Sequence, residues 1–185
     1  MRWTLIRLEL AASALLVGVA AVWSAWRGLG LVAALTPSLA AVGVGIAAGL
    51  VLATSLPLIT APWAHRVLVL RGLRRAWDAL ESGIGPGLSR TEILVLALGA
   101  AISEEAFFRG AVQPELGLVS ASLLFGLMHP LGIAYVVWAT IAGGALGGLA
   151  IATGGLVAPI AAHGTYNLLA LTYLRRRSAR PGDLL

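Results

Sequence analysis

Apolar stretches separated by short polar breaks extend along the chain. Five of these stretches are long, and they are residues 8–26, 38–58, 91–112, 134–151 and 156–174. Each approaches the roughly 20 residues with which an α-helix crosses a bilayer. A shorter apolar stretch at 117–129 follows a turn expected at 113–115. The pattern therefore predicts an all-α fold, a polytopic membrane helix bundle with about six transmembrane helices.

Residues 59–90 are more polar and show a helical repeat of apolar positions. The apolar side chains of this repeat are Trp63, Val67, Leu70, Leu73, Trp77 and Leu80. The charged side chains on the opposite side are Arg71, Arg74, Arg75 and Asp78. This arrangement predicts one amphipathic helix that lies in the membrane interface, with its arginines toward anionic headgroups of the lipid bilayer. His65 belongs to the same surface segment, and we assign it no function.

The composition indicates an integral membrane protein. Of the 185 residues, 59% are hydrophobic and 11% are charged, and the mean hydropathy is +0.92. Soluble domains of this size carry many more polar residues. The chain has no cysteine, which excludes disulfides, thiolate nucleophiles and cysteine metal ligands. No stretch interleaves basic and aromatic residues as nucleic-acid-binding proteins do, so no nucleic-acid partner is expected.

The arginines predict the orientation in the membrane. With six spans and a cytoplasmic N-terminus, the cytoplasmic segments hold Arg2, Arg7, Arg66, Arg71, Arg74, Arg75, Arg90, Arg175, Arg176, Arg177 and Arg180. Only Arg27 lies outside, and Arg109 lies within a span. This asymmetry follows the positive-inside rule and places both termini in the cytoplasm. Arginine without lysine, together with abundant Ala, Gly and Leu, is typical of a GC-rich bacterial genome, which makes the membrane the cell (inner) membrane.

The first apolar stretch has two interpretations. A charged start followed by an apolar stretch is also the pattern of a cleavable signal peptide. We favour an uncleaved span, because Trp23 and Trp26 resemble an interfacial aromatic belt. Cleavage would leave the rest of the topology unchanged.

Three charged residues, Glu104, Glu105 and Arg109, lie inside the apolar run Ile93 to Val112, which is part of the stretch 91–112. A charge at this depth costs a few kcal/mol, so these residues need partners and a purpose. Glu105 and Arg109 are four residues apart on a helix and face each other, which predicts a structural ion pair. Glu104 is rotated by about 100° and is left as a free carboxylate that can act as a base. Glu92, by contrast, stands three residues after Ser89 and is interpreted as a helix cap.

Two histidines follow the acidic pair within the apolar stretches. His129 stands four residues after Phe125, and His163 stands four residues before Asn167. Taken singly, each has a structural explanation, either a helix end at the interface or hydrogen bonds between helices. Glu104 can likewise be a buried acid that bonds a neighbouring helix. Taken together, an acid, a histidine and a histidine with an amide can converge in one cavity, a set that suits water activation and oxyanion stabilisation.

These motifs resemble the signature of the CAAX-protease and bacteriocin-processing (CPBP) family. The three motifs are Glu104-Glu105-x-x-x-Arg109, Phe125-x-x-x-His129 and His163-x-x-x-Asn167. The residues around them, 122–126 and 162–167, are similar too, and the resemblance covers about residues 92–172. The family consists of intramembrane endopeptidases related to the type II CAAX prenyl endopeptidase. It implies three regions, which are a two-span region with the amphipathic helix at 1–90, a catalytic helix core at 91–174 and a basic tail at 175–185.

The resemblance implies a role for each motif residue. Glu104 would act with His129 to activate a water for attack on a peptide carbonyl. His163 and Asn167 would donate hydrogen bonds to the oxyanion. The supporting residues would be Glu105, Arg109 and Phe125. The substrate would be a membrane-associated peptide or protein, and nothing in the sequence indicates prenylation.

No cofactor is expected. Members of the family have been described both as metalloproteases and as glutamate-type proteases, and two histidines with two glutamates can in principle hold zinc. We favour a reaction without metal, because no H-E-x-x-H motif is present and the residue set suits direct activation of water. Two other functions stay open: a non-catalytic scaffold or bacteriocin-immunity protein of the same fold, and a small proton-coupled transporter that uses Glu104 and the histidines as a relay. The oligomeric state does not follow from the sequence.

Depth in the membrane sets one further expectation. At 1.5 Å per residue, Glu104 lies about 20 Å and His163 about 17 Å from the cytoplasmic side. The stretch 117–129 is too short to cross an apolar core of about 30 Å. We therefore expect the fourth helix to end inside the protein, with His129 projecting into a water-filled cavity that is open to the cytoplasm.

Overall fold

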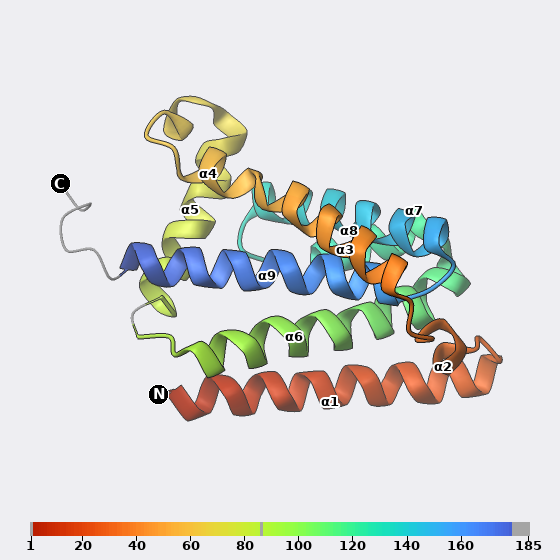
Figure 1. Ribbon diagram of the computed structural model, residues 1–185. Coiled ribbons are helices and arrows are strands. Elements are labelled where there is room, and N and C mark those ends of the chain that lie inside the picture. Colours follow the sequence, from red (N-terminus) through yellow and green to blue (C-terminus); the bar gives the residue numbers. More distant parts are fainter. Residues whose placement is uncertain (1, 86, 179–185) are drawn as a thin grey trace.

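The computed structural model describes residues 2–85 and 87–178, and all regular structure in them is helical (Figure 1). The helices are α1 Arg2–Arg27, α2 Leu31–Ala34, α3 Leu39–Ala53, α4 Ser55–Thr60, η1 Ala64–Arg66, α5 Leu68–Gly83, α6 Arg90–Phe107, η2 Phe108–Val112, α7 Gln113–Leu127, α8 Ile133–Thr153 and α9 Val157–Ser178. The predicted all-α bundle is confirmed. Of the predicted basic tail, Arg175 to Arg177 form the last turn of α9, whereas Arg180 lies outside the described residues.

The long helices run side by side, and α5 crosses them at one end of the bundle (Figure 1). Helix α9 is central and packs on α3, α6 and α8. Helix α7 packs on α8, and α1 lies at the edge, where it packs on α6. A polar contact joins α1 to α6. In it, the Ser13 hydroxyl donates to the Ser103 hydroxyl at 3.2 Å.

Three helical segments of the described residues are long and apolar enough to cross a membrane. They are Thr4–Arg27, Leu39–Thr60 and Ile133–Thr153. The other three expected spans differ for identifiable reasons. Helix α6 carries two glutamates in its last turn, α9 carries polar side chains that line a cavity, and α7 is short. Helices α6 and α9 therefore depend on contacts with the rest of the bundle to cover their polar groups.

Glycines allow α3 and α9 to approach closely. A Cβ atom at Gly45 would overlap the Ala158 carbonyl oxygen, and one at Gly49 would overlap that of Ala162. Both glycines are buried on the face of α3 that meets α9. Close approach of backbones is how helices gain dispersion contacts where no hydrophobic effect drives them together.

The amphipathic helix is shorter than its sequence pattern predicts. Leu73 and Trp77 are buried against the protein itself, in one apolar cluster with Leu174 of α9. Trp63 and Val67 are exposed instead, because the helix begins at Leu68 and Val67 has an extended backbone. The apolar side of α5 thus covers the end of the helix bundle. His65 is exposed in the short helix η1, as expected for a residue of a surface segment.

Of the two local predictions for α6 and α7, the helix cap is confirmed and the turn is not. Ser89 and Glu92 form the expected capping box at the start of α6. The expected turn at 113–115 is wrong, since the chain stays helical there and breaks at Gly117, where φ is +79°. Only glycine adopts this backbone angle without strain, which explains why the break falls there. Between α6 and α7 the chain forms the buried π-helical segment η2.

The glycine contact between α3 and α9 yields a stability prediction. Gly45→Ala should lower the unfolding midpoint of the protein in detergent, with a loss of about 1–3 kcal/mol from overpacking against α9. Gly43→Ala is the matched control, because it lies on the same helix with no atom within 4 Å of its Cβ position. Equal midpoints for the two variants would show that the α3–α9 contact is not tight.

Candidate active site

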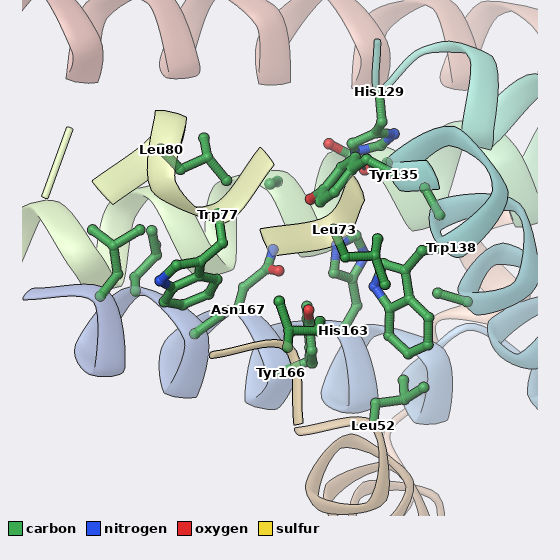
Figure 2. Close-up of a pocket in the computed structure, with 18 of the residues that line it drawn as sticks. Leu52, Leu73, Trp77, Leu80, His129, Tyr135, Trp138, His163, Tyr166 and Asn167 are labelled. Carbon is green, nitrogen blue, oxygen red and sulfur yellow. Dashed lines mark ion pairs between the residues drawn. The ribbon is translucent and has the colours of Figure 1, made fainter. Parts of the chain in front are cut away.

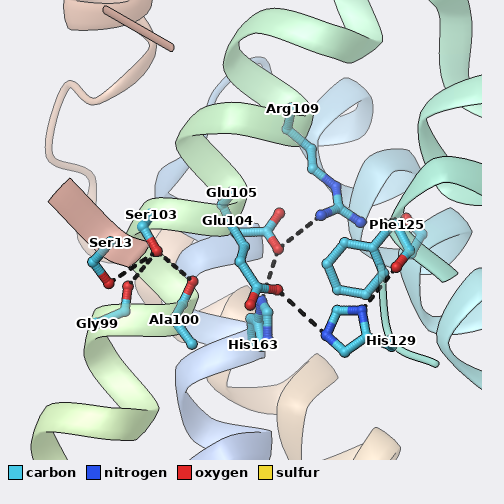
Figure 3. A network of polar contacts seen from close by, with 11 residues as sticks. Ser13, Gly99, Ala100, Ser103, Glu104, Glu105, Arg109, Phe125, His129 and His163 are labelled. Atoms are coloured by element: carbon cyan, nitrogen blue, oxygen red, sulfur yellow. Dashed lines mark hydrogen bonds and ion pairs between the residues drawn. The ribbon is translucent and has the colours of Figure 1, made fainter. Parts of the chain in front are cut away.

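The Glu105 side chain joins two helices in the middle of the bundle. One of its oxygens, Oε1, accepts a hydrogen bond from Arg109 Nη1 at 3.0 Å and lies 2.8 Å from His163 Nδ1 (Figure 3). The Glu105 side chain is fully buried and that of Arg109 is 1% exposed. The predicted pair of Glu105 with Arg109 is thus confirmed. The bond from Glu105 to His163, which links α6 to α9, was not expected.

Arg109 also reaches a third helix. Its Nη2 donates to the Gly143 carbonyl oxygen of α8 at 2.8 Å. The guanidinium lies over the Phe125 ring, 4.6 Å from its centroid. A Cβ atom at Gly143 would come within 3.4 Å of the Arg109 guanidinium and within 3.1 Å of the Phe125 ring. The missing side chain at Gly143 therefore makes room for both groups.

Glu104 faces His129 across a short gap. Glu104 Oε2 lies 3.7 Å from His129 Nε2, which is too long for a direct hydrogen bond (Figure 3). The same carboxylate oxygen is buried and receives no hydrogen bond from the described residues. The prediction that Glu104 is not paired with Arg109 agrees with this geometry.

The Phe125 residue orients His129. Its carbonyl oxygen lies 2.7 Å from His129 Nδ1, and its ring stacks on the imidazole with centroids 4.6 Å apart. The Phe125 ring also meets the His163 ring edge to face at 5.9 Å. Helix α7 ends at Leu127, and His129 follows after the single residue Met128. The short fourth helix thus brings His129 beside Glu104, as expected from the depth argument.

One cavity brings together all four residues that the sequence singled out as catalytic. Glu104 from α6, His129 after α7, and His163 and Asn167 from α9 line it together. Figure 2 shows His129, His163 and Asn167 in this cavity. Its volume is about 290 Å³. Most of the remaining wall is apolar, and α5 contributes Leu73, Trp77 and Leu80. The structure therefore confirms the convergence of these side chains, while their catalytic role stays a prediction.

The donor atoms of this site are not arranged for a metal ion. No group of three or more His, Asp or Glu side chains within residues 2–85 and 87–178 can hold one. Glu105 is bonded to Arg109 and His163 rather than turned toward Glu104 and His129. The residues present do not fit a zinc site, and we derive no step through one.

Besides the bond of Arg109 to Gly143, sequence reasoning missed two polar contacts in and beside the site. One is the Glu105–His163 bond, whose residues lie 58 positions apart. The other is the Gln113 side chain, which donates to the Gly147 carbonyl oxygen at 3.1 Å. The only signal for either was a polar side chain within or beside an apolar stretch, since no spacing along one helix can reveal a partner on another.

Comparison with protein families matches residues 86–169 to the family described as type II CAAX prenyl endopeptidase Rce1-like. This part of the chain is similar to that family. The match covers somewhat less than half of the 185 residues and nearly the same stretch as the predicted resemblance. Comparisons with curated proteins and with solved structures give no match. The Rce1-like stretch spans the facing pair Glu104 and His129 as well as His163 and Asn167.

The buried ion pair yields a second prediction. Glu105→Gln should lower the free energy of unfolding by about 3–5 kcal/mol, because Arg109 loses its charged partner inside the bundle. Asp78→Asn is the matched control, since Asp78 also accepts from an arginine four residues away, but at the surface. That change should cost about 1 kcal/mol or less. Unfolding midpoints in detergent compare the two, and similar losses would contradict the structural importance of Glu105.

Proposed function

We propose that the chain is an intramembrane endopeptidase, which hydrolyses a peptide bond in a membrane-associated peptide or protein. The observation that carries this proposal is the facing pair Glu104 and His129, in a cavity that His163 and Asn167 also line. The Rce1-like match of residues 86–169 supports the same class of reaction.

The first step concerns the 3.7 Å gap between Glu104 and His129. The Phe125 carbonyl can only accept a hydrogen bond, so Nδ1 of His129 carries a proton, and in the neutral form of this imidazole, which the proposed reaction uses, Nε2 presents a lone pair. Glu104 Oε2 is an acceptor as well. A water molecule can donate one O–H to each of two facing acceptors, which is the usual bridge across such a gap. In the proposed reaction, Glu104 takes a proton from this water while the water oxygen attacks the scissile carbonyl carbon.

The second step is stabilisation of the oxyanion. Glu105 Oε1 already accepts from Arg109, so His163 Nδ1 donates to it. Donation from His163 Nε2 to the oxyanion then requires the imidazolium form, and the Asn167 amide supplies a second donor. With this protonation, the two glutamates balance Arg109 and His163, and the site carries no net charge. Neutrality of the site lowers the cost of burying its four charges in an apolar bundle.

The third step breaks the peptide bond. The tetrahedral intermediate collapses as the C–N bond cleaves, and the proton held by Glu104 passes to the leaving nitrogen. The second proton of the water stays on the new carboxylic acid and then passes to the new amine, so one product carries a carboxylate and the other an ammonium group, while Glu104 returns to its starting state. No cofactor takes part in this proposed glutamate-type reaction.

We propose that the protein lies in a cell (inner) membrane with both termini in the cytoplasm. The start of α1, the crossing helix α5 and the end of α9 lie at one end of the bundle (Figure 1). Most of the arginines belong to these segments, whereas Arg27 closes α1 at the opposite end. This distribution supports the orientation that the positive-inside rule predicts.

The role of Glu104 yields the central test. Glu104→Gln should reduce peptide cleavage by about 10²-fold or more, because the amide cannot accept the proton of water. Membranes that contain the wild type or this variant are compared by proteomics for substrates that stay uncut. Glu115→Gln is the control, since Glu115 pairs with Arg27 away from the cavity.

Two outcomes would overturn the proposal. An unchanged phenotype of the Glu104→Gln variant would favour a non-catalytic scaffold or immunity protein. Proton-coupled flux in liposomes without peptide cleavage would favour a transporter. Equal unfolding midpoints of variant and wild type show that lost cleavage does not come from misfolding.

The Asn167 amide yields a separate test. Asn167→Ala should lower kcat by about 10²–10³-fold and leave KM nearly unchanged, because an oxyanion donor acts mainly in the transition state. The measurement uses a peptide from a substrate that the proteomic comparison identifies. Thr172→Ala on the same helix, outside the cavity lining, is the control. A raised KM with unchanged kcat would assign Asn167 to substrate binding instead.

A further inference from the structure

A groove lies where the start of α5 meets the start of α8, separate from the catalytic cavity. Its apolar wall consists of Leu68, Val69, Leu131, Ile133 and Val137. Its volume is about 650 Å³. Several of these apolar side chains are largely exposed to solvent, with Ile133 86% and Leu68 76% exposed. Nothing in the described chain covers this wall.

The groove also has a positive rim. Arg71 and Arg75 of α5 line it, and both are exposed. They are four residues apart, so they lie on the same side of the helix. Neither guanidinium group makes an ion pair or a hydrogen bond within the described residues, and the Arg71 backbone N–H donates to the Val67 carbonyl oxygen at the start of the helix. Arg74 on the same helix differs, since it pairs with Asp78 and donates to the Thr60 carbonyl.

The position of the groove indicates its surroundings in a membrane. Helix α8 is one of the segments able to span a membrane, and it begins at Ile133. If α8 spans the apolar core over its 21 residues, its first turn and the apolar wall beside it lie at one edge of the hydrocarbon, where acyl chains end and headgroups begin. Arg71 and Arg75 stand on the helix that crosses the bundle at this end (Figure 1). Apolar side chains below two unpaired guanidinium groups complement a molecule with acyl chains and an anionic head.

We propose that this groove binds an anionic phospholipid. The phosphate lies between Arg71 and Arg75, because guanidinium groups bind phosphate oxygens with matching geometry. The acyl chains run along Leu68, Ile133 and Val137. Charge complementarity favours this occupant over a neutral lipid, and the exposed apolar wall favours it over a soluble anion. The proposal does not depend on the proposed peptidase activity.

An occupied groove would also touch the chain segment that carries His129. Leu131 and Gly132 line the groove, and the Leu131 amide donates to the His129 carbonyl oxygen at 2.8 Å. The lipid would therefore pack two residues away from a side chain of the catalytic cavity.

The test measures lipid binding directly on the full chain purified in a mild detergent. Native mass spectrometry follows titrations with phosphatidylglycerol and with phosphatidylcholine of the same acyl chains. The wild type should bind one phosphatidylglycerol about 10-fold more tightly than phosphatidylcholine, as expected for two arginines near a lipid phosphate. Arg71→Gln/Arg75→Gln should abolish this preference. Arg175→Gln/Arg176→Gln removes the same charge from the end of α9 and should keep it.

Two further measurements identify whether the bound phosphate belongs to a lipid or to a soluble anion. Leu68→Ser/Ile133→Ser should weaken phosphatidylglycerol binding several-fold, and soluble glycerol phosphate should not displace the lipid. Displacement by glycerol phosphate would show that the site takes a free anion, and equal binding of the two lipids by the wild type would show no anion selectivity. Equal losses in the two double-arginine variants would indicate a general charge effect. Each of these results would overturn the proposal, and unfolding midpoints verify that every variant is folded.

Discussion

A single carboxylate oxygen of Glu105 organises the centre of this bundle. It bonds Arg109 and His163 at once, and Arg109 continues to the Gly143 carbonyl of α8. Charges inside an apolar bundle are stable only when they are paired and hydrogen-bonded, so this contact fixes how α6, α8 and α9 are oriented. Glu104, one residue earlier, is then directed to a different side, where it meets His129 rather than Arg109.

The buried polar contacts of Glu105 and Arg109 depend on glycines, which leave space between the helices. Gly143 leaves room for the Arg109 guanidinium, and Gly45 and Gly49 let α3 approach α9. A Cβ atom at Gly126 would likewise overlap the Thr140 side chain and the Val136 carbonyl oxygen of α8. Small residues at such contacts replace the hydrophobic effect, which is weak between helices surrounded by lipid. The same close approach holds the polar side chains at hydrogen-bond distance.

The Rce1-like stretch supplies the polar residues of the cavity, but it does not enclose the cavity alone. Leu52 of α3, Ile59 of α4 and Trp77 of α5 also line it, and all three precede the matched residues. The predicted boundary near residue 90 therefore separates two regions of the sequence that do not pack separately. Residues of both regions lie in one apolar core. In the proposed peptidase, the first part of the chain would shape the space that a substrate enters, and the matched part would supply the reacting groups.

The sequence alone determined what depends on neighbours along one helix. Apolar length set the helices, and spacing of four residues set the pair of Glu105 with Arg109 and of Phe125 with His129. Only the tertiary structure decided that His163 bonds Glu105, because the rotation of α9 against α6 results from the packing of several helices at once. It also decided that the helix after Val67 starts late, because its apolar side has to fit the end of the bundle. Helical periodicity is local, whereas contacts between helices require all of their faces to be placed together.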